Sequence, residues 1–221
     1  MRMRTKKHLE TRLEKCADLQ INDPEEAKGN WNKIFQNNNP VYLEIGCGKG
    51  TFIKKNAEMF PGINFVAMEK DRNVIISAME PIKKENIKNV KFICDNADLL
   101  DEYFDENECE RIYLNFSDPQ PKSGYKKKRL THEKYLSMYK RILKHGAGIH
   151  QKTDNKGFFE FSLNSLADSG FLLKNISLDL HVDNPAESSE TNPAENIMTE
   201  YEMKFIEMGL PIYRLEAVNN K

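Results

Sequence analysis

The chain has 221 residues, of which 39% are hydrophobic and 30% are charged. This length and composition are typical of a soluble globular protein and favour one domain over two. The formal net charge of −1 excludes indiscriminate binding to polyanions, so any contact with nucleic acid has to come from local clusters of charge.

Targeting and metal-binding signals are missing from the sequence. No apolar run is long enough to span a bilayer, and no apolar stretch follows the basic segment Met1–His8 as it would in a secretory signal. We therefore expect a cytoplasmic protein with no membrane partner. Cys16, Cys47, Cys94 and Cys109 lie far apart and form no C-x-x-C pair, so the sequence predicts neither a disulfide framework nor a metal site.

Helices and strands are predicted to alternate along one domain that spans residues 1–221. A helical lead-in over about residues 1–38 contains a helix near 25–35, which Asn22-Asp23-Pro24 would begin. The predicted strands are near 41–45, 63–68, 90–94, 111–116, 147–151, 171–178 and 210–217. The other predicted helices are near 49–59, 71–86, 131–144, 156–169 and 199–208. The alternation predicts an α/β fold with a mostly parallel seven-stranded sheet and helices on both faces, and the polar residues 183–196 predict a mobile loop.

The first predicted strand runs into three alternate glycines, Gly46, Gly48 and Gly50. Because glycine has no Cβ, a ligand can lie against the backbone there, at the N-terminus of the following helix. The dinucleotide fingerprint G-x-G-x-x-G would need a third glycine where this chain has Thr51. The tighter G-x-G-x-G, with Glu44 just before it, looks like the S-adenosylmethionine loop of class I methyltransferases. A chance glycine-rich turn is the alternative.

Acidic and amide side chains follow the second and third predicted strands. Glu69 stands at the end of the second strand, where a carboxylate can accept hydrogen bonds from both ribose hydroxyls of an adenosine. The alternative is a solvated acid at a helix start. Asp95 and Asn96 follow the third strand, and either could bind the adenine amino group. The sequence does not decide between them, and a simple turn is the alternative there.

The most unusual string follows the fourth predicted strand. Two prolines stiffen the loop that presents Asp118 and Lys122. An aromatic ring and a cluster of cations come next, which suits a phosphate backbone beside an unstacked base, and a solvated charged face is the alternative. The residues of this cluster are Gly124, Tyr125, Lys126, Lys127, Lys128 and Arg129.

Two further acids lie close to the ends of later elements. Asp154 follows the fifth strand, on the same edge of the predicted sheet as the glycine loop. Thr199 and Glu202 have the spacing of a helix capping box. Asp154 and Glu202 could instead accept hydrogen bonds from the N1–H and the exocyclic amine of a guanine. The sequence leaves both roles open.

These motifs together closely resemble the bacterial tRNA (guanine-N7)-methyltransferase family, from about Leu43 to Phe205. The resemblance is carried by Leu43–Gly50, Asn115–Pro119, Lys122, Lys152–Asn155 and Thr199–Glu202. It implies a Rossmann-like class I methyltransferase fold, S-adenosylmethionine as methyl donor, and the guanine at position 46 of the tRNA variable loop as acceptor. It departs from the family at Gln120, where an aromatic residue is usual, and at Ser123-Gly124-Tyr125, where the family is more uniformly basic.

The resemblance also implies roles for individual residues. The cofactor site would contain Glu44, Gly46, Gly48, Glu69, Asn96 and Asp118. The substrate would be contacted by Lys122, Asp154, Thr199, Glu200, Tyr201 and Glu202, and RNA by residues 123–128 with Arg129. Asp118 would also be catalytic, because its carboxylate would stabilise the positive charge that forms on the purine.

Two rival functions remain open from the sequence. A class I methyltransferase acting on a small molecule or a protein would use the same glycine loop, although the basic cluster argues against it. A nucleotide-binding or RNA-binding module without methyl transfer is the second rival, and the presence of Glu44, Glu69 and Asp118 together argues against a degenerate site. The oligomeric state is left open between a monomer and a homodimer.

Overall fold

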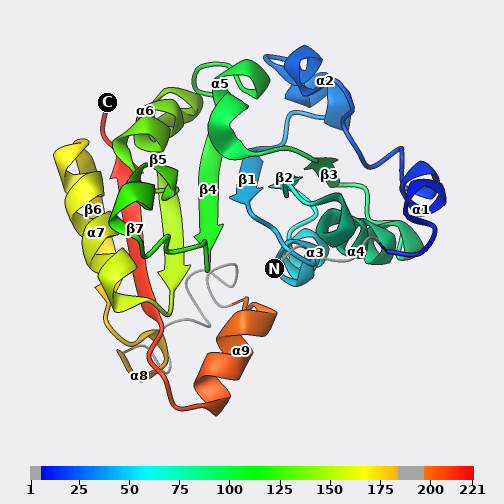
Figure 1. Cartoon of the computed structure of the whole chain (residues 1–221). Coiled ribbons are helices and arrows are strands. Elements are labelled where there is room, and N and C mark those ends of the chain that lie inside the picture. Colours follow the sequence, from blue (N-terminus) through cyan, green and yellow to red (C-terminus); the bar gives the residue numbers. More distant parts are fainter. Residues whose placement is uncertain (1–5, 184–196) are drawn as a thin grey trace.

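A seven-stranded sheet forms the centre of the computed structural model, which describes residues 6–183 and 197–221 (Figure 1). The strand order is β3-β2-β1-β4-β5-β7-β6. Parallel pairing joins β3, β2, β1, β4 and β5, and β7 runs antiparallel to both β5 and β6. The strands are β1 (Val41–Ile45), β2 (Asn64–Met68), β3 (Val90–Ile93), β4 (Cys109–Asn115), β5 (Leu143–Thr153), β6 (Phe171–Ser177) and β7 (Tyr213–Asn219). The predicted fold class is confirmed.

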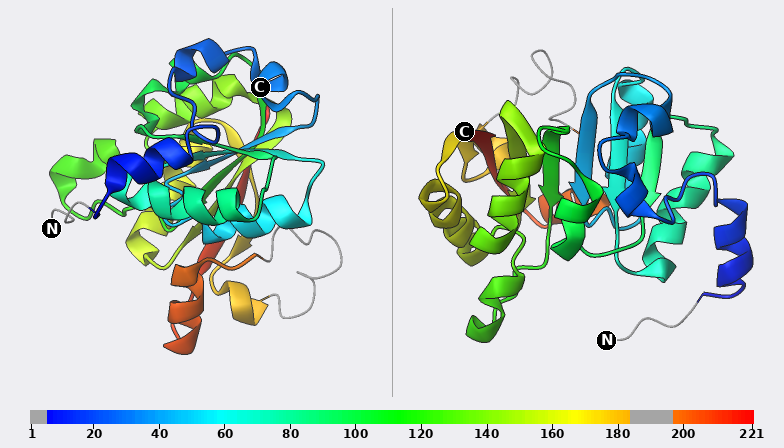
Figure 2. Two further views of the ribbon diagram at one scale, coloured as in Figure 1. Left: turned by 90° about the vertical axis from the view of Figure 1, so that its right-hand side faces the viewer. Right: turned by 90° about the horizontal axis from the view of Figure 1, so that it is seen from above.

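Helices cover both faces of this sheet (Figure 2). The α-helices are α1 (Leu9–Lys15), α2 (Trp31–Phe35), α3 (Thr51–Met59), α4 (Arg72–Lys84), α5 (Leu100–Tyr103), α6 (Glu133–Ile142), α7 (Lys156–Asp168), α8 (Leu180–Asp183) and α9 (Glu200–Glu207). The 3-10 turns are η1 (Pro24–Ala27), η2 (Ala97–Leu99) and η3 (Ser123–Lys128). The helices α1, α3 and α4 share one hydrophobic core on one face of the sheet, and α2, α5, α6 and α7 share the core on the other.

Strand β2 shows why two cores form. Successive side chains of a strand point to opposite faces, so a central strand needs apolar residues on both. Phe65 and Ala67 pack with α3 and α4, whereas Val66 and Met68 pack into the core beneath α5 and α6. All four are fully or almost fully buried, which explains why this strand is a continuous apolar run in the sequence.

The lead-in corrects one sequence prediction. The single helix expected near 25–35 is divided into η1 and α2, because Gly29 between them has a φ of +71°. The amide of Gly29 donates to Glu108 Oε2 at 3.1 Å. After this break Trp31 turns inward, donates from its indole nitrogen to the carbonyl of Tyr103 at 3.1 Å, and stacks on Phe104. The lead-in is therefore fixed to the segment that connects β3 to β4.

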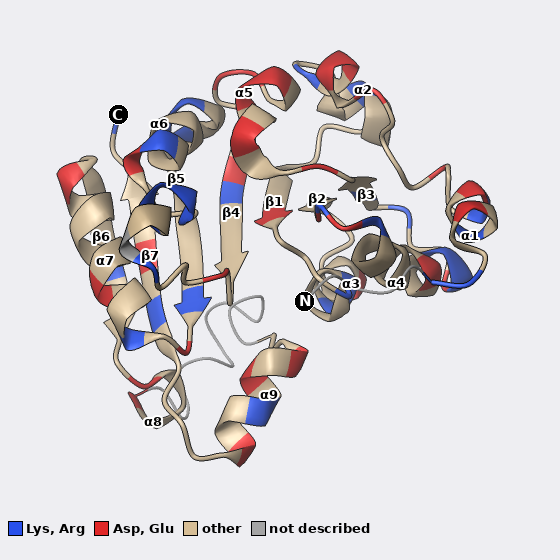
Figure 3. Cartoon of the chain, in the orientation of Figure 1, with Lys and Arg blue, Asp and Glu red and all other residues tan. Residues whose placement is uncertain are grey.

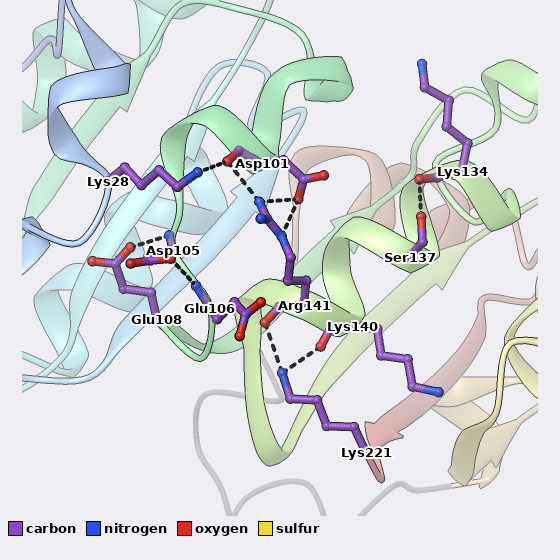
Figure 4. A network of polar contacts seen from close by, with 10 residues as sticks. All are labelled: Lys28, Asp101, Asp105, Glu106, Glu108, Lys134, Ser137, Lys140, Arg141 and Lys221. Atoms are coloured by element: carbon purple, nitrogen blue, oxygen red, sulfur yellow. Dashed lines mark hydrogen bonds and ion pairs between the residues drawn. The ribbon is translucent and has the colours of Figure 1, made fainter.

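A network of polar contacts ties the lead-in and the C-terminus to α5 and α6 (Figure 4). Lys28 Nζ donates to the carbonyl of Asp101 at 2.7 Å. Arg141 donates to the same carbonyl at 2.9 Å and to the Asp101 carboxylate at 3.0 Å. Lys221 Nζ donates to the carbonyls of Lys140 and Arg141, both at 2.9 Å.

Several elements were not predicted from the sequence. Helices α1, α5 and α8 and the turns η2 and η3 are all short, and β5 extends beyond its predicted range. Of the predicted mobile loop, residues 184–196 lie outside the described residues, and Asp183 ends α8. Its carboxylate accepts from Ser177 Oγ at 2.7 Å.

Charge and cysteines are spread through the fold. Side chains of both charge signs occur on α1, α3, α4, α6, α7 and α9, in keeping with the net charge of −1 (Figure 3). The four cysteines are free thiols, and three of them are buried. Within residues 6–183 and 197–221, no three His, Cys, Asp or Glu side chains gather where a metal ion could be held. None of the helices in these ranges is long and apolar enough to cross a membrane.

Candidate active site

A cavity of about 520 Å³ opens at the carboxyl ends of β1, β2, β3 and β4. In an open α/β sheet, ligands bind where the strand order reverses, and here that point lies between β1 and β4. The volume is within the range of small-molecule sites. The cavity is lined by Ile45, Gly46, Met68, Glu69, Lys70, Asp95, Asn96, Ala97, Asp98, Phe116, Ser117, Asp118, Gln120, Lys128, Leu130 and Tyr135.

The glycine loop forms a cradle on one side of this cavity. Gly46 has a φ of +81°, and a Cβ built on it would meet no atom within 4 Å. A ligand can therefore approach the backbone at Gly46 closely. Gly50 has a different function, since a Cβ there would lie 2.5 Å from the Cβ of Ala78 on α4. Glycine at this position lets α3 and α4 pack against each other.

Glu69 follows β2 directly and faces the glycine loop, as the sequence predicted. Its Oε2 accepts from the amide of Gly48 at 3.3 Å, and its Oε1 accepts from the amide of Asp71 at 3.1 Å. The carboxylate is half-buried and lines the cavity. It is thus held at the tip of β2, where a ribose of a ligand lying on the glycine loop would be within its reach.

Glu44 lies beside the cavity without lining it. Its side chain on β1 is only 2% exposed, and Asn115 Nδ2 on β4 donates to its Oε1 at 3.0 Å. Its second oxygen, Oε2, is buried and accepts no hydrogen bond from residues 6–183 or 197–221. The pKa of Glu44 is raised to about 7, mainly by burial and also by the nearby charge of Glu69, while the hydrogen bond from Asn115 opposes the rise. The buried oxygen is an acceptor that a ligand donor would satisfy.

The two candidate residues in the turn after β3 have different hydrogen-bond partners within the protein. Asp95 accepts from the hydroxyl of Tyr103 at 2.6 Å and from the amide of Asn96 at 2.7 Å, so both of its oxygens are engaged. The oxygen of Asn96 caps η2 by accepting from the amide of Asp98 at 2.7 Å. The exposed side-chain NH₂ of Asn96 makes no hydrogen bond within the described residues and remains available to a ligand. The turn chemistry expected as an alternative is present as well.

Asp118 lies on a conformationally restricted loop that follows β4 and lines the cavity. Two non-glycine residues of this loop are left-handed, Phe116 with a φ of +51° and Gln120 with a φ of +45°. Asp118 is exposed to the cavity, and its Oδ1 accepts from the amide of Gln120 at 2.9 Å. Ser117 also lines the cavity, and its hydroxyl is buried with no hydrogen-bond partner in the part of the chain that the structure describes. Such strain in a loop is typical of functional sites.

Helix α9 joins the glycine loop to the Asp118 loop. The carboxylate of Glu200 accepts from Lys49 Nζ at 3.1 Å and from Thr51 Oγ1 at 3.0 Å. These hydrogen bonds lower the pKa of Glu200. The ring of Tyr201 stacks on Phe116 with the centroids 6.2 Å apart. Residues separated by about two thirds of the chain are thereby brought together beside the cavity.

Comparisons with known proteins show which family this chain belongs to. A family model described as "Putative methyltransferase" matches residues 38–215. The tRNA (guanine-N(7)-)-methyltransferase of Bacillus subtilis (strain 168) is 44% identical over 98% of this chain and 98% of its own length. That of Streptococcus agalactiae serotype III (strain NEM316) is 44% identical over 98% of this chain and 99% of its own.

This chain belongs to the tRNA (guanine-N7)-methyltransferase family.

Solved structures with low sequence identity show the same fold. An antibiotic-related methyltransferase has a TM-score of 0.58 at 18% identity and covers 86% of this chain and 92% of its own. A 30S ribosomal A1408 methyltransferase from an uncultured bacterium has a TM-score of 0.54 at 17% identity, with the same coverage of both chains. This member of the tRNA (guanine-N7)-methyltransferase family therefore has the sheet of class I methyltransferases.

The basic cluster is almost entirely exposed in this tRNA (guanine-N7)-methyltransferase family member. Lys122 precedes η3, which projects from the body of the molecule as the green turn in Figure 2. Gly124, Lys126 and Lys127 are exposed, and Tyr125 is 44% exposed. The ammonium of Lys128 lies 4.5 Å from the centroid of the Tyr125 ring. Lys128 also lines the cavity.

Arg129 does not share this exposure. Its side chain is buried, and its guanidinium donates to the carbonyls of Pro119 and Gln120. Burial argues against the RNA contact that the sequence predicted for this residue.

The two remaining acids differ in exposure. Asp154 is exposed beyond the end of β5. Glu202 is fully buried and forms the predicted capping box with Thr199, and Lys152 Nζ lies 3.1 Å from each of its carboxylate oxygens. The capping alternative is thus confirmed, and burial argues against a contact of Glu202 with a guanine. A contact of Asp154 with a guanine stays a prediction.

Several lining residues were not predicted from the sequence. Lys70 directly follows Glu69, and Asp98 belongs to the turn after β3, so both lay next to recognised motifs. Leu130 and Tyr135 come from the segment around the start of α6 and carry no such signal. The hydroxyl of Tyr135 donates to Asp98 Oδ1 at 2.9 Å, and burial raises the pKa of this tyrosine to about 12.

Proposed function

We propose that this chain transfers a methyl group from S-adenosylmethionine to N7 of a guanine in tRNA, and that the guanine is the one at position 46 of the variable loop. The observation that carries the proposal is the cavity at the β1/β4 reversal, where Gly46, Glu69, Asn96 and Asp118 meet. These residues were singled out from the sequence, and the chain is 44% identical to its Bacillus subtilis relative over almost its full length.

The residues present fit S-adenosylmethionine. Gly46 offers open space beside its backbone, and Glu69 offers a carboxylate to a ribose. Asn96 has an NH₂ group available, and Glu44 and Ser117 each have a buried oxygen with no hydrogen-bond partner among the described residues. When bound, S-adenosylmethionine supplies a methyl group made electrophilic by a sulfonium centre. The acceptor N7 has an in-plane lone pair and no proton, so no general base is needed at that atom.

Positioning and electrostatics are the contributions left to the protein. Methylation at N7 leaves a positive charge on the purine. We infer that the carboxylate of Asp118, exposed at the cavity, stabilises this charge. The amide of Gln120 donates a hydrogen bond to the Asp118 carboxylate, and this bond helps to hold the carboxylate at the cavity.

Binding of tRNA is assigned to the exposed basic cluster. Lys126, Lys127 and Lys128 project on η3 beside the cavity, with Tyr125 next to them. Cations beside the reaction site suit the phosphates on either side of a guanine that has left its stack. We also propose that Lys122 and Asp154, both exposed, contact the substrate.

Because the proposed substrate is tRNA, we also propose a cytoplasmic location. We propose that the protein acts as a monomer or a homodimer.

One experiment tests the reaction and its position together. The purified protein is incubated with radiolabelled S-adenosylmethionine and an unmodified tRNA transcript, and the labelled guanine is located by the alkali lability of N7-methylguanine. A matched transcript with adenine at position 46 is the control. Label at guanine 46 that is absent from the control is the expected result. Label at another position would overturn the choice of guanine, and retained cofactor binding without transfer to any tRNA would overturn the function.

A further inference from the structure

Arg129 differs from every other cation in the basic cluster. It directly follows η3, and its side chain is 9% exposed, whereas Lys126, Lys127 and Lys128 are exposed. It makes no ion pair within the described residues. Its guanidinium lies 4.5 Å from the centroid of the Phe161 ring on α7. A cation placed in this way is directed into the protein and away from an approaching RNA.

Among the described residues, the side-chain hydrogen bonds of Arg129 go to the loop that carries Asp118. Nε donates to the carbonyl of Pro119 at 2.9 Å, and one terminal NH₂ group donates to the carbonyl of Gln120 at 3.3 Å. The planar fork of a guanidinium suits two neighbouring acceptors, and a lysine cannot reproduce it. Both carbonyls belong to residues directly after Asp118.

This loop needs support from outside itself. Gln120 has a left-handed φ of +45°, and proline at 119 has no N–H to donate. Within the loop, the amide of Gln120 donates to Asp118 Oδ1 at 2.9 Å. Displacement of Gln120 would therefore move the carboxylate of Asp118, and both residues line the cavity.

We propose that Arg129 is a positioning residue, which holds the Asp118 loop in place and connects it to the RNA-binding turn η3. The proposal rests on the proposed function, because that function gives Asp118 its part in methyl transfer. The backbone makes the connection direct, since the amide of Arg129 donates to the carbonyl of Lys126 at 3.1 Å. Contact of η3 with tRNA is thereby linked to the position of Asp118 through a single residue.

The test compares Arg129→Gln with Lys127→Gln, which removes one exposed charge from the same cluster. Three quantities are measured for each variant: the affinity for S-adenosylmethionine by calorimetry without RNA, kcat and KM with tRNA, and the dependence of tRNA affinity on salt. Arg129→Gln is expected to weaken S-adenosylmethionine binding and to lower kcat by about tenfold or more, because misplacement by about 1 Å can cost ~100-fold in rate. Its salt slope is expected to match the wild type.

Lys127→Gln is expected to give the opposite pattern. It should raise the KM for tRNA and reduce the salt slope by about 0.7–0.9, the contribution of one phosphate contact, without weakening S-adenosylmethionine binding. Arg129→Lys should recover only part of the kcat that Arg129→Gln loses, because an ammonium lacks the planar fork with which the guanidinium donates to both carbonyls. If Arg129→Gln does not fold, Phe161→Leu is measured instead, which removes the ring against the guanidinium and should lower kcat in the same direction.

Unchanged kcat and S-adenosylmethionine affinity in Arg129→Gln would overturn the proposal, whether or not the salt slope changes. A reduced salt slope with those two quantities unchanged would show that Arg129 contacts RNA. Failure of the proposed function is a separate outcome. In that case the wild type transfers no methyl group to tRNA, while calorimetry still reports whether Arg129 supports the cavity.

Discussion

Glu44 shows how one buried carboxyl group makes folding depend on pH. Burial raises its pKa from the ordinary value of 4.5 to about 7. The folded protein therefore binds this proton more tightly than the unfolded chain does. The contribution of Glu44 to stability is complete below about pH 4.5, falls as the pH rises towards 7, and is lost above that pH.

Glu44→Gln is expected to remove this dependence. The glutamine keeps an oxygen for the hydrogen bond from Asn115 and has no charge to bury. The free energy of unfolding of the variant, relative to the wild type, should rise between pH 5 and pH 8 by on the order of 3 kcal/mol at most. Urea denaturation of the ligand-free protein measures this difference. Glu160→Gln, an exposed change on α7, is the control, and parallel pH profiles for Glu44→Gln and wild type would contradict the prediction.

Asp118 gives a prediction in which charge and hydrogen bonding are separated. Asp118→Asn keeps an oxygen to accept from the amide of Gln120 but removes the charge, whereas Asp118→Ala removes both. We expect both variants to lower kcat with tRNA by roughly 10²–10³, the effect of removing one group that stabilises transition-state charge. Steady-state kinetics at saturating S-adenosylmethionine measure the effect. Near-normal turnover of Asp118→Asn, in a protein with unchanged unfolding, would show that the charge has no such role.

At the scale of single elements, the sequence predicted best what depends on local pattern. Strand β1 was predicted with its observed bounds, because an apolar run meets a glycine turn there. The capping box of α9 was also readable, since it depends on two residues three positions apart. The lead-in helix was predicted as one segment, because a single glycine inside a helical pattern does not reveal that its φ is positive.

The parts of the site that were missed depend on tertiary contacts. The hydrogen bond from Thr51 to Glu200 joins residues 149 positions apart, and no local pattern indicates it. The burial of Arg129 was missed for a related reason. Its place in a run of cations indicates a solvated face, whereas the carbonyls of Pro119 and Gln120 and the ring of Phe161 become its partners only in the folded chain.

The turn η3 gives a prediction that belongs to an element as a whole. Its lysines Lys126, Lys127 and Lys128 are exposed and follow one another, and under the proposed function they would bind a phosphate backbone together. Their replacement by alanine is expected to lower tRNA affinity and to reduce the salt slope by about 0.7–0.9 for each phosphate that the variant no longer neutralises. Filter binding over a range of salt concentrations measures both quantities. S-adenosylmethionine binding to the same variant is the check on folding, and an unchanged tRNA affinity and slope would exclude this turn from the RNA interface.

At the scale of the whole molecule, the topology brings the site together. The reversal of strand order between β1 and β4 opens the cavity, and the glycine loop, Glu69 and the Asp118 loop meet there because they all follow parallel strands. The first two residues of helix α9 then contact both loops, Glu200 at Thr51 and Tyr201 at Phe116. A ligand in the cavity would therefore contact or border segments from most of the chain.

Binding of S-adenosylmethionine should for this reason stabilise the whole fold. At a ligand concentration of about 100 Kd, the free energy of unfolding rises by about 2.7 kcal/mol, and for a chain of this size each kcal/mol raises Tm by about 2–4 °C. We expect a Tm increase of about 5–10 °C with S-adenosylmethionine and none with NAD, because Thr51 stands where a dinucleotide fingerprint needs glycine. Glu69→Ala at the same ligand concentration should show a smaller increase, since the carboxylate facing the glycine loop is gone. An increase with NAD alone would mean that the cavity holds a dinucleotide, and an equal increase in Glu69→Ala would remove that residue from the cofactor site.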